Sequence, residues 1–192
     1  TTTINYLDGT TTNLYGGGNK TNSATSTIDV TNGTIANLFG GGNEAGIDDT
    51  TIHITNGQFQ NVYGGSNKSG TVTNTTITVT AGNITNLYGG NNEGGNVTTT
   101  NVNVSKGYIT NLFGGGNKVP TTTTNLTISG NDDTIANVYG GGNSANATNV
   151  SIIQKGGTIT SLYGGSNKSG SVDKVTINHN QGTTLNLFGG NN

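Results

Sequence analysis

Side chains that could carry acid–base or metal chemistry are few in this chain of 192 residues. The two histidines, His53 and His179, lie five repeats apart in the pattern described below, about 24 Å at the usual strand spacing, so they cannot share a metal ion. The densest acids, Asp48–Asp49 and Asp132–Asp133, lack the neighbouring oxygen ligands that a Ca²⁺ site needs. We therefore expect no catalytic residue, no metal site and no cofactor.

The glycine-rich turns do not match known ligand loops. The motif Gly-Gly-x-Asn is followed by neither a helix pattern nor Lys-Ser/Thr, so it is not a phosphate loop. A calcium-binding nonapeptide roll needs an Asp in each turn, where this chain has Asn or Ser. Polysaccharide lyases and hydrolases built on a β-helix carry clustered Asp, Lys and Arg in a cleft, and this chain has no arginine. We expect that the protein is not an enzyme.

Composition excludes further classes. With seven lysines, no arginine and a net charge of −2, the chain has no basic footprint for nucleic acid or an anionic membrane. No apolar stretch approaches the roughly 18 residues of a membrane span. Only 28% of the residues are hydrophobic, but they recur periodically, whereas disorder would scatter them. The sequence therefore predicts a thin and elongated core.

An aromatic residue followed by Gly-Gly recurs eight times, at intervals of 24, 24, 25, 25, 26, 24 and 25 residues. Such a fixed period is the signature of a repeat architecture. The aromatic row is Tyr15, Phe39, Tyr63, Tyr88, Phe113, Tyr139, Tyr163 and Phe188. The residue after each Gly-Gly runs Gly, Gly, Ser, Asn and then repeats that order, and the string GGSNKSG occurs at 64–70 and 164–170. We infer that a block of four units has been duplicated.

Each unit reads as two short strands. Residues 27–31 (Thr-Ile-Asp-Val-Thr) alternate polar and apolar, which is typical of a half-buried strand, and residues 31–33 (Thr-Asn-Gly) form a corner where Asn and Gly tolerate positive φ. A second strand ends at the aromatic residue, where Gly-Gly supplies φ values that other residues avoid. The apolar pairs that we align with Ile28 and Val30 are Ile4/Tyr6, Ile52/Ile54, Ile77/Val79, Val102/Val104, Leu126/Ile128, Val150/Ile152 and Val175/Ile177.

A unit this small can bury its apolar face only against the next unit. We therefore predict an all-β fold, a single parallel β-helix (β-solenoid) of eight coils, right-handed by the crossover rule and about 38 Å long. The whole chain, 1–192, is one domain. The predicted coils are 1–19, 20–43, 44–67, 68–92, 93–117, 118–143, 144–167 and 168–192.

Stacking places equivalent residues in rows. One invariant row is Asn19, Asn43, Asn67, Asn92, Asn117, Asn143, Asn167 and Asn192. A second is Asn13, Asn37, Asn61, Asn86, Asn111, Asn137, Ser161 and Asn186. An amide can donate to one neighbouring coil and accept from the other, so we interpret these rows as hydrogen-bonded ladders that staple the turns, in preference to ligand sites.

Two further rows hold the charged and the aromatic residues. The residue after the first Asn row alternates in charge, which sets register and solubility more than stability: Lys20, Glu44, Lys68, Glu93, Lys118, Ser144 and Lys168. The aromatic row lies either inside, thickening the core, which we favour, or outside as a lateral contact surface. The predicted outward row on the first strand is polar but varied: Asn5, Asp29, His53, Thr78, Asn103, Thr127, Ser151 and Thr176.

The units at 27–43 (TIDVTNGTIANLFGGGN) and 76–92 (TITVTAGNITNLYGGNN) resemble repeats of very long adhesin-like surface proteins of anaerobic bacteria and archaea. The resemblance covers the whole chain. It implies a parallel β-helix and an extracellular or cell-surface address, and it supplies no catalytic residue.

Three functional hypotheses follow. The first is an extracellular structural protein, a filament, sheath or stalk, because the eight units carry no polar cap and open β-edges recruit further strands, here from a second copy, head-to-tail. The second is an adhesin-type module whose Thr/Asn face contacts glycan or another surface. The third is ice binding, which Asp29, His53, Asn103 and Lys174 disfavour because they interrupt a regular Thr array.

Overall fold

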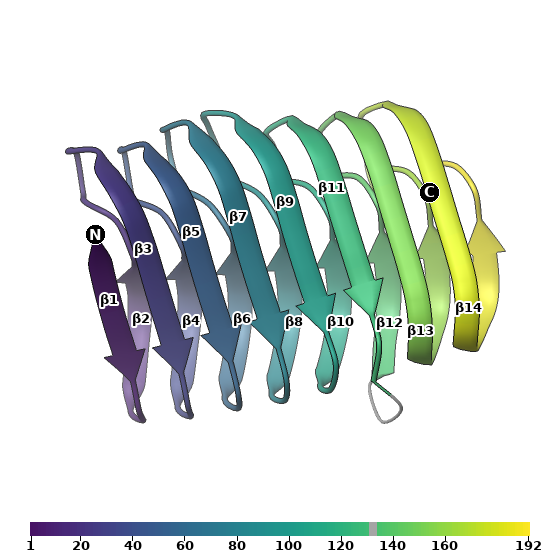
Figure 1. The fold of residues 1–192 in the computed structure, drawn as a ribbon, viewed down its shortest axis with the longest axis horizontal. Helices are drawn as coiled ribbons and strands as arrows, with labels where there is room; N and C mark the ends of the chain where they lie inside the picture. Colours follow the sequence, from purple (N-terminus) through teal and green to yellow (C-terminus); the bar gives the residue numbers. More distant parts are fainter. Residues whose placement is uncertain (131–133) are drawn as a thin grey trace.

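The computed structural model describes residues 1–130 and 134–192 and contains no helix there. The acidic pair at positions 132–133 lies outside the described residues. The strands form two parallel walls that face each other along a solenoid (Figure 1). The odd wall holds β1 (Thr2–Tyr6), β3 (Ser23–Val30), β5 (Ile47–Ile54), β7 (Val72–Val79), β9 (Val97–Val104) and β11 (Thr121–Ile128). The even wall holds β2 (Thr10–Tyr15), β4 (Thr34–Phe39), β6 (Gln58–Tyr63), β8 (Asn83–Tyr88), β10 (Tyr108–Phe113) and β12 (Thr134–Tyr139).

Two long strands, β13 (Ala147–Tyr163) and β14 (Val172–Phe188), run through both walls at the last two levels. Every pairing between neighbouring levels is parallel. In Figure 1 the nearer strands run downward and the more distant strands upward as the chain advances from its purple to its yellow end, so the coil is right-handed. The predicted β-solenoid is confirmed. Eight levels are joined by about seven full turns, slightly fewer than the eight coils expected.

The main core is a narrow strip between the walls. The odd wall contributes two inward rows, represented by Ile28 and Val30, and the even wall contributes two more, represented by Ile35 and Leu38; all four side chains are at most 1% exposed. Both apolar residues of β4 thus face inward, although three positions separate them. β-Branched and leucine side chains fill this space because they fit a pleated surface.

Glycine serves two different purposes in the coil. At the corner after each of the first five odd strands it takes a positive φ, as at Gly33 (109°) and Gly57 (124°), which confirms the corner. The Gly-Gly pair after the aromatic residue was predicted to need special φ values, and that is wrong, since neither Gly40 nor Gly64 has positive φ. A Cβ on Gly40 would instead collide with the carbonyl oxygen of Gly64, so close approach of successive coils excludes a side chain.

One level departs from the common coil. Where the first five levels turn at a glycine corner after the odd strand, β13 continues through Gln154 and Lys155, with a register shift on either side of Lys155. The side chain of Gln154 is fully buried, its Nε2 donates to the Thr183 carbonyl oxygen at 3.3 Å, and its Oε1 accepts from Thr184 Oγ1 at 2.6 Å. A buried amide therefore occupies the place of an apolar residue.

This departure corrects two sequence-based alignments. Ser151 pairs with Asn125, so the outward row continues instead through Ile153 and then Asn178, not through Ser151 and Thr176. Val150 pairs with Thr124 and Val175 with Val150, so these valines do not align with Ile28. His179 pairs with Gln154 and so belongs to the inward row of Val30, and it is exposed at the last described level.

The four-unit block has a structural basis. The N–H of Ser66 donates to Asn91 Oδ1 at 2.7 Å, and Asn91 Nδ2 donates to the carbonyl oxygens of Gly70 and Gly94 at 2.9 and 3.0 Å. Both side chains are fully buried. The second block repeats the first of these contacts, from Ser166 to Asn191, at 2.8 Å. The Ser and Asn of each block therefore depend on being adjacent, in that order.

Candidate functional site

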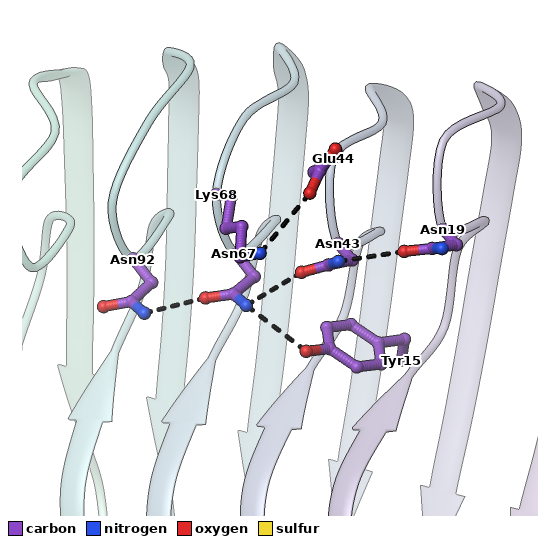
Figure 2. Close-up of polar contacts among 7 residues, drawn as sticks. All are labelled: Tyr15, Asn19, Asn43, Glu44, Asn67, Lys68 and Asn92. Carbon is purple, nitrogen blue, oxygen red and sulfur yellow. Dashed lines mark hydrogen bonds and ion pairs between the residues drawn. The ribbon is translucent and has the colours of Figure 1, made fainter.

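The Asn ladder at the turns is continuous over all eight levels (Figure 2 shows four of them). In each step Nδ2 of one Asn donates to Oδ1 of the Asn one level earlier, at 2.8–3.0 Å. The predicted ladder is confirmed. All seven bonds point the same way, so the ladder has a donor side at Asn19 and an acceptor side at Asn192.

The second Asn row forms a shorter ladder with the same polarity. Its bonds measure 2.9–3.0 Å from Asn13 through Asn137. Ser161 takes the next place, and beyond it the amide of Asn186 donates to the Thr160 carbonyl oxygen at 3.3 Å. The side chain of serine is too short to continue the row.

The aromatic rings form a continuous stack along the solenoid. Successive ring centroids are 4.6–5.2 Å apart and successive planes differ by at most 11°. The five central rings are 2–6% exposed and form a cluster separate from the main core. They are thus buried, as we favoured, but they build a second core instead of thickening the first.

A hydrogen bond links the aromatic stack to the Asn ladder. Asn67 Nδ2 donates to Tyr15 Oη at 3.2 Å, beside the ladder (Figure 2).

Burial raises the pKa of the Tyr63 and Tyr88 phenols, with a smaller contribution at Tyr63 from neighbouring Tyr88. Burial also raises the pKa of Tyr139. These three phenols therefore stay neutral to a higher pH than an exposed tyrosine does.

Opposite charges meet along the charge row. Lys68 Nζ lies 3.4 Å from Glu44 Oε1, and Lys118 Nζ lies 3.7 Å from Glu93 Oε1. Lys20 and Lys168 occupy the same row at its first and last turns, and Ser144 interrupts it. All four paired side chains are more than a third exposed, so each pair contributes little to stability.

A row of buried hydroxyls was missed from the sequence. Ser26, Thr50, Thr75, Thr100 and Thr124 are at most 2% exposed, and each donates to a Gly carbonyl oxygen in the turn that follows the next even strand, at 2.5–2.7 Å. These bonds tie the odd wall to the turn. The signal was present as a Ser or Thr two positions before the first buried apolar residue.

Side chains that could take part in acid–base or metal chemistry are few among the described residues. His53 Nδ1 lies 2.7 Å from Asp29 Oδ1 one level earlier, a pair that the sequence reasoning missed, and both side chains are about half exposed. Asp49 accepts a hydrogen bond from Asn74 at 2.8 Å. Over residues 1–130 and 134–192, no three His, Cys, Asp or Glu side chains gather closely enough to hold a metal ion.

Comparison with known proteins gives no relative: the chain matches no family model, no curated protein and no solved structure. None of the described residues belongs to a helix that could span a lipid bilayer.

Proposed function

We propose that this chain is an extracellular structural protein, a segment of a filament, sheath or stalk that extends by stacking one β-coil on another. The observation that carries the proposal is the single polarity of the Asn ladders. A further coil can continue them only if its Asn donates to Asn192 or accepts from Asn19. Head-to-tail stacking satisfies this requirement, whereas head-to-head stacking would place two donors together.

The surface of β14 is the one that a further coil would cover. Leu187 and Phe188 are 48% and 46% exposed there, while the equivalent residues of an inner level, Leu38 and Phe39, are 0% and 3% exposed. A coil docked on β14 buries this apolar surface and pairs its open backbone groups. We propose a second copy of this chain as that coil. The extracellular address rests on the resemblance of the repeat units to surface-protein repeats.

Cryo-electron microscopy of the purified chain at high concentration tests this proposal. The expected result is a fibre with a layer line at about 4.8 Å and an axial repeat of about 38 Å. The control is a double variant, Leu187→Lys with Phe188→Lys, which places two charges on the docking surface and should leave short rods. Separate short rods of the unsubstituted chain at every concentration would contradict head-to-tail assembly.

A further inference from the structure

A trough on the outer face of the even wall is not explained by the stacking function. It crosses β4, β6, β8, β10 and β12 and encloses about 570 Å³. Four steps at the usual strand spacing make it about 19 Å long. Two rows of outward side chains flank the trough. The residues between these rows, such as Ile35 and Ile84, point into the core, so their backbone forms the floor of the trough.

The two flanking rows come from the five even strands that the trough crosses. One row is Thr34, Gln58, Asn83, Tyr108 and Thr134. The other is Ala36, Gln60, Thr85, Thr110 and Ala136. Among the described residues that line the trough, none is charged.

Tyr108 is the one aromatic side chain in these two rows, whose other members are Thr, Gln, Asn and Ala. It is 64% exposed, while the aromatic residues of the inner stack are buried. It also lines a second hollow of about 670 Å³ over the adjoining corner, which it shares with Asn83. The ring therefore stands between two hollows, accessible to a ligand.

The amides beside this ring differ from those of the ladders. Each Asn of the inner ladder levels bonds to the next, but the side chains of Gln58, Gln60 and Asn83 make no hydrogen bond to any other described residue. Gln58 and Asn83 are direct neighbours in the pairing of β6 with β8. Their donors and acceptors are thus available to a ligand.

We propose that this trough binds a neutral oligosaccharide, with one sugar ring stacked on Tyr108 and hydroxyls bonded to Gln58, Gln60 and Asn83. An aromatic face packs against the C–H groups of a sugar, and amides can both donate to and accept from its hydroxyls. A single-stranded nucleic acid would need a basic groove, which the lining does not provide. A peptide adding as a strand would need an open edge, and the floor of the trough is already paired on both sides. The site is independent of the proposed stacking.

The test is an array of linear hexasaccharides of glucose, xylose, mannose and N-acetylglucosamine, with uronate-rich and sulfated glycans as charged comparisons, followed by calorimetry on the hits. We expect binding to neutral glycans only. Tyr108→Ala should weaken it by about tenfold or more, and Gln58→Ala with Gln60→Ala should weaken it several-fold. Tyr108→Phe keeps the ring and should retain binding.

Thr158→Ala is the matched control, since Thr158 continues the Tyr108 row on β13 beyond the trough and should leave affinity unchanged. All of these side chains are exposed, so circular dichroism and melting temperature should match the unsubstituted chain. Failure to bind any neutral glycan, binding of charged glycans alone, or binding that Tyr108→Ala leaves intact would overturn the proposal. Filament formation by electron microscopy is a separate readout and does not depend on this result.

Discussion

At the scale of single residues, the Gly-Gly pair after each aromatic residue shows how closely the coils approach one another. A Cβ on Gly64 would collide with the Gly89 carbonyl oxygen, whereas a Cβ on Gly189, in the same row, meets nothing within 4 Å. We expect Gly64→Ala to lower the free energy of unfolding by about 1–3 kcal/mol. Urea denaturation measures this difference. Gly189→Ala is the control, and equal losses in both variants would refute the close-approach explanation.

Two buried threonines should respond to the same substitution with opposite signs. Thr75 Oγ1 donates to the Gly89 carbonyl oxygen at 2.6 Å, so Thr75→Val should destabilise by about 1 kcal/mol. Thr121 Oγ1 is buried and finds no hydrogen-bond partner among the described residues, and its row neighbours are Val97 and Ala147. Thr121→Val should therefore stabilise the fold by about 1 kcal/mol. Thermal melting of both variants checks the pair, and a destabilised Thr121→Val would be contrary to expectation.

At the scale of elements, the buried tyrosines of the aromatic stack make the free energy of unfolding vary with pH in the alkaline range. Burial raises the pKa of Tyr63, Tyr88 and Tyr139 in the folded chain, whereas in the unfolded chain each phenol ionises near its ordinary pKa of about 10. Above about pH 10 the unfolded state thus binds fewer protons than the folded state. These three phenols should therefore leave the free energy of unfolding unchanged below that pH and lower it as pH rises beyond it.

Melting temperatures between pH 8 and pH 11.5 measure this dependence. The control replaces Tyr63, Tyr88 and Tyr139 by Phe, which already occupies the row at Phe39 and Phe113 and keeps the rings stacked. This variant should lose much less stability at high pH. If both proteins lost stability in parallel, ionisation elsewhere would be the cause.

The order of the elements was readable from the sequence because each coil repeats the same local pattern. Strands, corners and Asn rows follow from the alternation at residues 27–31 and the Asn-Gly corner. The misalignment of Val150 and Ser151 at the seventh level arose because the unit was aligned on its first apolar residues and not on its aromatic residue. Ile152 precedes Tyr163 by the same 11 positions that separate Ile28 from Phe39, so counting back from Tyr163 gives the register at this level.

Other features could not be read from a local pattern. The separate aromatic core depends on ring contacts between levels, and the trough is formed by two rows of side chains from five levels, which only stacking brings together. Tyr108 stands where neighbouring repeats have Thr, Gln or Asn, and a single repeat gives no reason to single it out. The buried role of Gln154 needed the partners Thr183 and Thr184, which belong to the following level.

At the scale of the whole molecule, each level contacts only its neighbours, so stability should vary along the stack. In dilute solution, amides from β3 to β12 should exchange with deuterium most slowly, and those of β1, β2 and β14 most rapidly, because these levels have one neighbour each. Hydrogen-exchange mass spectrometry measures this gradient. In assembled material the amides of β14 should become protected, and uniform exchange along the chain in both states would count against stacking.

The fixed order of Ser and Asn in each four-unit block, Ser66 before Asn91 and Ser166 before Asn191, bears on how such a gene can change. Because Asn91 is followed by Gly116 and the whole order then starts again, unequal crossing-over between the coding sequences of the two blocks would add or delete four coils at once. Every new junction would match one that already exists at the middle of the chain. The length of the rod then becomes a heritable quantity that changes in increments of about 19 Å, without selection having to refine a new interface each time.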